Sequence, residues 1–70
     1  MNNIIGRNIR AKREELGMDQ RELAGRAGIS AAAVSKIEKG KNIPMADTLR
    51  KIAKALHCDM ERFFDGIEVS

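Results

Sequence analysis

The chain is poor in the residues that usually cross-link or stiffen a small protein: it has one cysteine, one proline and two aromatic residues, Phe63 and Phe64. A lone cysteine cannot form an internal disulfide, so a reducing, cytoplasmic setting is expected. With so few aromatics, the core must be aliphatic, which suits short packed helices. No apolar run approaches the roughly 20 residues that cross a bilayer, and the N-terminus lacks the basic-then-apolar pattern of a secretory signal.

The composition that is present fits one small folded domain spanning residues 1–70, with 65–70 as a tail. Hydrophobic residues make up 43% of the 70 positions and charged residues 33%. Thirteen basic and ten acidic side chains give a net charge of +3, which is compatible with nucleic-acid binding without proving it. The basic residues gather in two places, Arg7, Arg10, Lys12 and Arg13 and then Lys36, Lys39 and Lys41, although a solvated mixed surface is the alternative interpretation.

Apolar spacing and capping residues predict an all-α fold of five helices with no strand. The helices are expected at about 4–16, 20–27, 31–38, 46–56 and a short last one ending near 64. In the fourth, Leu49, Ile52, Ala53 and Leu56 repeat at helical spacing on one face. Asp19 is a good N-cap for the second helix, and Asp59 for the last.

Residues 20–39 form the most informative pattern, because they predict two short helices joined by a glycine turn. Leu23 and Ala27 make an apolar pair one turn apart, and Val34 and Ile37 make another in the following helix. Gly28 between them supplies the left-handed backbone position that commonly ends a helix. Ser30 and the small Ala24, which permits close helix crossing, complete a helix-turn-helix pattern.

The chain resembles the phage-repressor, Cro-like helix-turn-helix family, also called the xenobiotic-response-element type. The resemblance covers about residues 5–64 and rests on Ile9, Arg10, residues 13–15, Gln20, residues 22–24, 27–30 and 34–40, Pro44, Thr48, Leu49, residues 52–56, Phe63 and Phe64. It implies a compact five-helix, lambda-repressor-like domain that binds double-stranded DNA sequence-specifically. It does not fix the biology, because the family includes phage repressors, antitoxins, restriction-modification controllers and host regulators.

The resemblance also implies particular roles for residues at matching positions. The third helix would enter the major groove, and Gln20 at the start of the second helix would bond a phosphate. Arg13 and Glu38 would form a structural ion pair. The residues support this pair independently, because Arg13 lies one turn after Ile9, near the buried stripe where an unpaired charge would be costly.

The start of the third helix departs from the family pattern, because alanines stand where long amides or arginines often read bases. An alanine methyl can touch a thymine methyl but forms no side-chain hydrogen bond. Base readout is therefore assigned to Ser30, Ala31, Ala32, Ser35 and Lys36, helped by DNA shape. Phosphate contacts are assigned to Gln20, Arg21, Lys39, Lys41 and Asn42. The alternative is that the alanines simply favour helix and read no base strongly.

The loop before the fourth helix is the second departure. Met45 stands where similar proteins often carry a serine N-cap, so the fourth helix is expected to begin raggedly or to take its cap elsewhere. Ile43 precedes Pro44, which favours extended backbone, and we expect its side chain to pack beneath the loop.

The sequence gives little indication of a metal site or of catalysis. His57 and Cys58 are adjacent and have no second histidine or cysteine to help them, so a four-ligand metal site within one chain is excluded. His57 is expected in the turn after the fourth helix, because histidine tolerates positive φ, and Cys58 as a small buried hydrophobe. No catalytic motif is recognisable; neither enzyme activity nor a cofactor is expected.

The alternative to a DNA-binding repressor is an interaction module that keeps the fold but has weak DNA affinity. The alanine-rich third helix favours that alternative, whereas the basic and amide residues around it favour DNA. We expect binding as a homodimer on a near-palindromic site, with Met60, Phe64, Ile67 and Val69 as candidate dimer contacts. We expect neither a membrane association nor a small-molecule effector.

Overall fold

The computed structural model describes residues 3–66, which form four α-helices and one 3-10 helix. The α-helices are α1 (Ile4–Glu15), α2 (Gln20–Ala27), α3 (Ala31–Glu38) and α4 (Ala46–Ala55), and the 3-10 helix is η1 (Met60–Phe64). No strand occurs within these residues. The fifth predicted helix therefore exists as a five-residue 3-10 segment, a form that is common in short pieces.

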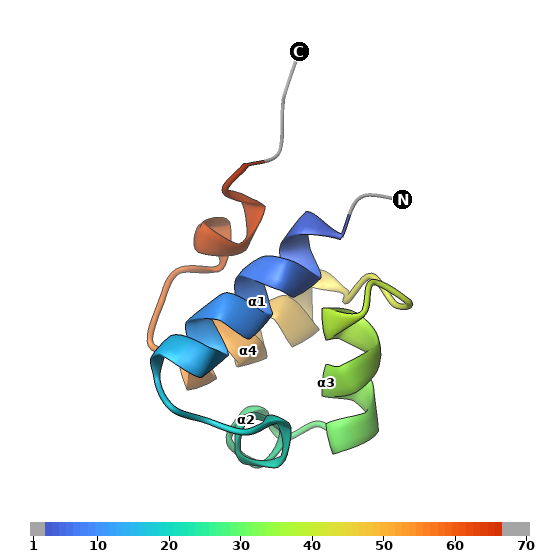
Figure 1. Cartoon of the computed structure of the whole chain (residues 1–70), viewed down its shortest axis with the longest axis vertical. Coiled ribbons are helices and arrows are strands. Elements are labelled where there is room, and N and C mark those ends of the chain that lie inside the picture. The colour runs from blue at the N-terminus through green and yellow to red at the C-terminus, as the bar shows by residue number, and fades with distance from the viewer. Residues whose placement is uncertain (1–2, 67–70) are drawn as a thin grey trace.

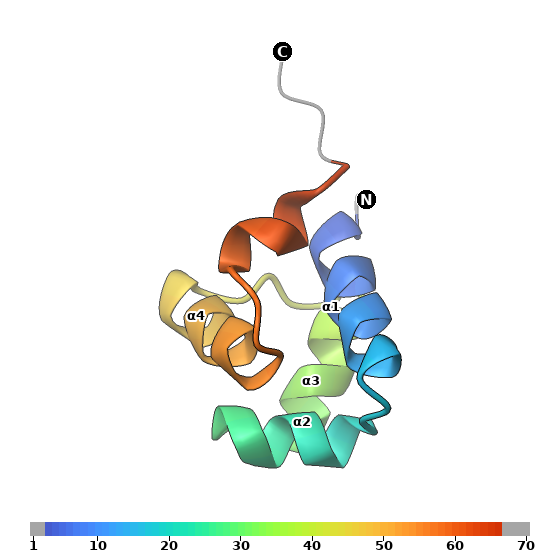
Figure 2. The same cartoon turned by 90° about the vertical axis from the view of Figure 1, so that its left-hand side faces the viewer.

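The helices close around a single aliphatic core. α2 packs against both α3 and α4, α3 packs against α1, and η1 packs against α1 and α4. Figure 2 shows α2 at one end of this arrangement and η1 at the other. The most fully buried large side chains are Ile9, Leu23, Val34, Ile52, Leu56 and Phe63. Phe63 is the one aromatic side chain in this otherwise aliphatic core.

Side-chain caps begin the two helices of the predicted helix-turn-helix. The carboxylate of Asp19 accepts a hydrogen bond of 2.7 Å from the backbone N–H of Glu22, and the hydroxyl of Ser30 accepts one of 3.0 Å from Ala33. Gly28 ends α2 at φ +72°, a left-handed conformation that glycine adopts without strain. These local signals explain why the bounds of α2 and α3 agree with the sequence-based ones.

A close approach joins the first turn of α1 to the last turn of α3. A side chain at Gly6 would collide with the backbone oxygen of Ile37 and lie 3.1 Å from the Cα atom of Glu38. Asn3 reinforces this contact, because its side-chain amide donates a 2.9 Å hydrogen bond to the backbone oxygen of Glu38. The absence of a Cβ at Gly6 thus determines how closely α3 lies to α1.

The loop between α3 and α4 contradicts one prediction. Ile43 is 79% exposed, so it does not pack beneath the loop. It lies in the irregular segment between α3 and α4, and its side chain faces solvent instead. Met45 occupies the N-cap position of α4 with extended backbone and provides no side-chain cap, so α4 begins without one, in agreement with the sequence.

The turn after α4 follows the sequence-based interpretation more closely. His57 adopts φ +56°, the one positive value at a non-glycine residue among residues 3–66. Cys58 is half-buried against the core rather than fully enclosed, and this burial raises the pKa of its thiol. Within the described part of the chain, no cluster of three metal-ligating side chains is found, and no helix is both long and apolar enough to span a bilayer.

Candidate nucleic-acid interface

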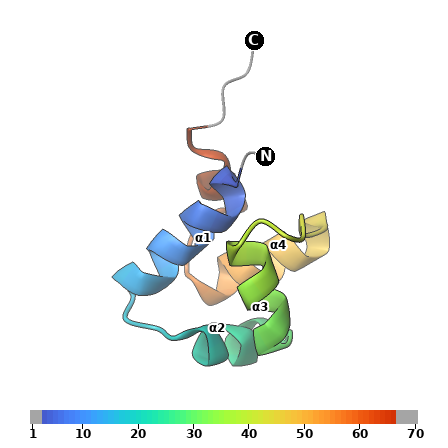
Figure 3. The ribbon, with the colours of Figure 1, turned by 45° about the vertical axis from the view of Figure 1, so that its right-hand side comes forward.

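The outward side of α3 is the candidate surface for reading DNA. Figure 3 shows α3 with α2 crossing at its lower end. Val34 and Ile37 hold α3 to the core, while Ala32 and Lys36, one turn apart, are exposed. α3 is therefore buried along one side only, and the opposite side carries short side chains and a central lysine.

The structure places the five predicted base-reading residues at different depths. Ser30, Ala32 and Lys36 are exposed and Ser35 is half-exposed. Ala31 is half-buried and packs against the core, which leaves only part of its methyl group for a ligand. The oxygen of Ser30 is occupied by its capping bond to Ala33, but a hydroxyl can still donate its proton.

The predicted phosphate-binding residues lie at the end of α3 and at the start of α2. Lys39, Lys41 and Asn42 are exposed at the end of α3, and Arg21 is exposed near the start of α2. The backbone N–H groups of Lys41 and Asn42 both point to the carbonyl of Lys36, at 2.9 and 3.4 Å. Those bonds fold the chain back sharply after α3 and hold the basic side chains beside its C-terminal end.

The ion pair expected between Arg13 and Glu38 is present and buried. Arg13 Nε donates to Glu38 Oε2 at 2.7 Å, and Arg13 Nη2 donates to Glu38 Oε1 at 3.0 Å. Arg13 Nη1 also donates to the backbone oxygen of Met18 at 2.6 Å. The hydrogen bond to Glu38 raises the pKa of Arg13, so the guanidinium remains charged in this buried position.

Gln20 joins the same network. Its side-chain nitrogen donates to Glu38 Oε1 at 3.0 Å, and its side chain is half-buried. An amide nitrogen carries two protons, so one remains available for a phosphate oxygen. The network therefore links α1, the start of α2 and the end of α3, and it fixes the orientation of the glutamine before any ligand binds.

The interface also depends on residues that sequence reasoning did not identify. Asn3 and Gly6 fix the end of α3 against α1. Asn8 donates to the backbone oxygens of Phe63 and Asp65, at 2.8 and 2.9 Å, and so anchors η1 on α1. Of these three residues, Gly6 alone could have been noticed in the sequence, because a glycine inside a predicted helix often marks a close packing contact. Nothing in the sequence around Asn3 or Asn8 indicated their contacts.

The dimer candidates have different environments. Met60 is half-buried against the core, whereas Phe64 is 38% exposed. Ile67 and Val69 lie outside the described residues. Of the two candidates that the structure describes, Phe64 is therefore the more available to a second molecule.

Two short helices joined at a left-handed glycine, with the second helix exposed along one side, define the helix-turn-helix class of protein. A family model described as helix-turn-helix matches residues 9–63. The chain therefore belongs to the helix-turn-helix family of phage repressors and related transcriptional regulators.

Individual relatives agree with this assignment. The chain is 39% identical over 64 residues to an uncharacterized transcriptional regulator in the ATPase CF(0) region of Rhodospirillum rubrum, covering 91% of this chain and 59% of that protein. It is 42% identical over 58 residues to the transcriptional repressor RghR of Bacillus subtilis, covering 81% of this chain and 43% of that protein. The chain thus spans about half the length of these relatives.

A solved structure with the same fold is that of the P22 c2 repressor protein in complex with a synthetic operator. The two structures superpose with a TM-score of 0.83 at 32% sequence identity, covering 90% of this chain and 96% of the other. The arrangement of α2 and α3 described above is therefore shared with a repressor domain seen on its operator.

Proposed function

We propose that this chain is a sequence-specific DNA-binding transcriptional regulator that inserts α3 into the major groove of duplex DNA. The observation that carries this proposal is the combination of a one-sided, exposed α3 with a glutamine oriented in advance at the start of α2. Family membership and the likeness to an operator-bound repressor support it. Because its ligand would be the chromosome, we place the protein in the cytoplasm, on the nucleoid when bound.

The roles divide by position on the surface. Lys36, in the middle of the exposed side, is the long donor that can reach a guanine edge, while Ala32 can touch a thymine methyl. Ser30, Ser35 and the accessible part of Ala31 complete the base-facing surface. Gln20, Arg21, Lys39, Lys41 and Asn42 would contact phosphates, which set orientation without carrying sequence information.

We further propose that two copies bind a near-palindromic operator. One domain of this size makes few phosphate contacts, and pairing across half-sites roughly 34 Å apart raises affinity because a second copy adds its own contacts to the same duplex. Exposed Phe64 supports a contact between copies near η1. Repression is the expected outcome, because a compact domain on a promoter blocks polymerase with no further surface.

The test is a binding titration against a duplex library over a series of salt concentrations. A pair of copies would bring about six cationic phosphate contacts from Arg21, Lys39 and Lys41, so the log–log slope of affinity against salt should be about −5. A slope near zero would contradict DNA binding and favour an interaction module. Footprinting of the selected site tests whether two copies bind together. High-affinity occupation of an isolated half-site by one copy would contradict pairing.

A further inference from the structure

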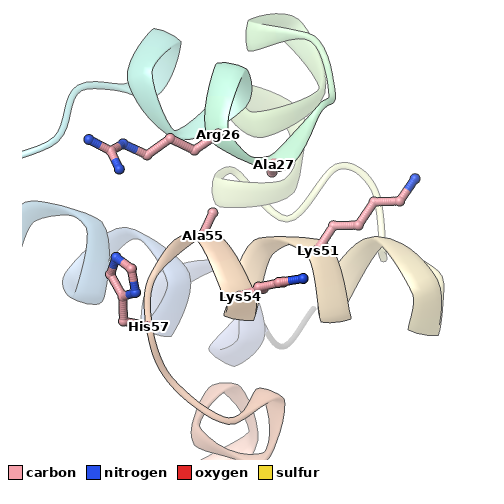
Figure 4. A pocket seen from close by; sticks show the side chains of 6 residues that line it. All are labelled: Arg26, Ala27, Lys51, Lys54, Ala55 and His57. Atoms are coloured by element: carbon pink, nitrogen blue, oxygen red, sulfur yellow. The ribbon is translucent and has the colours of Figure 1, made fainter.

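The C-terminal halves of α2 and α4, with His57 just after α4, line an open cationic pocket that the DNA-binding surface does not use. The pocket has a volume of about 400 Å³ and is lined by Arg26, Ala27, Lys51, Lys54, Ala55 and His57. Figure 4 shows Arg26 extending from α2 and the two lysines from α4, with the alanines between the helices. The pocket therefore has a cationic rim and a small apolar floor.

The positive charge of this pocket is largely uncompensated. No carboxylate lines it. Arg26 has one partner, Glu22, whose oxygen lies 3.0 Å from Arg26 Nη2 in an exposed pair. Neither Lys51 nor Lys54 forms an ion pair within residues 3–66, although Asp47 lies one turn before Lys51 on α4. Both lysine ammonium groups are thus available to an external anion.

The pocket opens away from α3. In Figure 4, α3 lies behind the helices that form the pocket, and no residue of α3 lines it. In Figure 1, α3 is at the right-hand side of the molecule, and Figure 2 views the molecule from the opposite, left-hand side. A ligand in the pocket can therefore be present while α3 lies in a DNA groove.

We propose that this pocket binds an acidic segment of a partner protein, and that it does so while α3 occupies DNA. The cationic rim and alanine floor suit a glutamate side chain, whose methylene groups would contact Ala27 and Ala55 and whose carboxylate would reach the rim. Lys51 and Lys54 lie three positions apart on α4, which places them on one side of the helix. They can thus receive two carboxylates of one extended segment. A second DNA segment is the competing ligand, and the test separates the two.

The test measures binding of a fluorescein-labelled octaglutamate peptide by anisotropy, with octaglutamine as the uncharged control. Lys51→Gln/Lys54→Gln removes the rim lysines, and Arg7→Gln/Arg10→Gln removes two exposed cations of α1 outside the pocket. Circular dichroism confirms that both variants fold. We expect the pocket variant to bind octaglutamate about fivefold more weakly, which corresponds to the loss of two exposed ion pairs. The α1 variant should bind octaglutamate as the unchanged protein does. The affinity of the pocket variant for DNA should also be unchanged.

Three results would overturn the proposal. An equal loss in both variants would mean that the peptide responds only to net charge. Displacement of the peptide by excess duplex would place it on the DNA-binding surface, and a matching loss of DNA affinity in the pocket variant would make the pocket a DNA contact. Because the peptide titration uses the protein without DNA, failure of DNA binding is distinguishable from failure of this proposal.

Discussion

At the scale of the residue, Glu38 links the folding of the domain to its proposed contact with DNA. Its carboxylate accepts two hydrogen bonds from Arg13 and one from Gln20, and its backbone oxygen accepts one from Asn3. All four bonds meet at the last residue of α3. The position of α3 relative to α1 and α2 therefore depends on a side chain that never faces the ligand.

Gly6 offers a direct test of the close contact between α1 and α3. Gly6→Ala should destabilise the protein by about 3 kcal/mol or more, because the new methyl group meets backbone atoms of α3 that cannot move aside. Gly25→Ala in α2 is the matched control: it meets no atom within 4 Å and should stabilise by roughly 0.5–1 kcal/mol. Urea unfolding measures both, and equal effects would show that helix propensity alone matters at Gly6.

Substitutions at Lys36, Lys39 and Lys41 distinguish base readout from phosphate binding. Lys36→Ala should change the preference between operator and scrambled duplex, because this lysine is exposed in the middle of the outward side of α3. Lys39→Ala and Lys41→Ala should weaken both duplexes by the same factor. Each should reduce the magnitude of the salt slope by about two, because each copy of the pair loses one phosphate contact. Competition binding makes the comparison. If Lys36→Ala lowers both affinities equally, the lysine contacts phosphate and specificity comes from DNA shape.

At the scale of the element, α4 is the helix whose start can be improved. Met45 stands at its N-cap with extended backbone, provides no cap and is 76% exposed. Met45→Ser should stabilise the domain by about 1 kcal/mol, since a serine hydroxyl can accept a bond from the first turn. Ser30→Ala should cost a similar amount at α3, where the cap exists. Thermal unfolding of the two variants should shift in opposite directions.

The same caps explain which elements could be predicted from sequence. Asp19, Ser30 and Gly28 are local signals, and the bounds of α2 and α3 follow from them. The Arg13–Glu38 pair was implied by the family resemblance, and the position of Arg13 near a buried stripe, where a charge requires a partner, supported it. Non-local contacts were not: Asn3 and Asn8 bind carbonyls far along the chain, and only the folded structure brings these atoms together. Ile43 was misjudged because burial was inferred from its apolar character alone.

At the scale of the whole molecule, the two adjacent phenylalanines have different expected roles: Phe63 in the stability of the domain and Phe64 in the contact between two copies. Phe63 is fully buried and Phe64 is 38% exposed. Phe63→Ala should destabilise by about 3 kcal/mol or more, a large fraction of the stability of any small domain. Phe64→Ala should change the free energy of unfolding by less than about 0.5 kcal/mol and yet weaken cooperative binding to the full operator. If cooperative binding is unchanged in Phe64→Ala, this residue does not contribute to the contact between copies.

The outward side of α3 has a consequence for how such a regulator can change. Within the described residues, the side chains of Ala32 and Lys36 support neither the core nor an internal hydrogen bond. New side chains at these positions would alter the choice of DNA sequence while leaving the scaffold intact. A lineage or a designer could thus retarget the protein to another promoter in single steps, each intermediate remaining folded and testable.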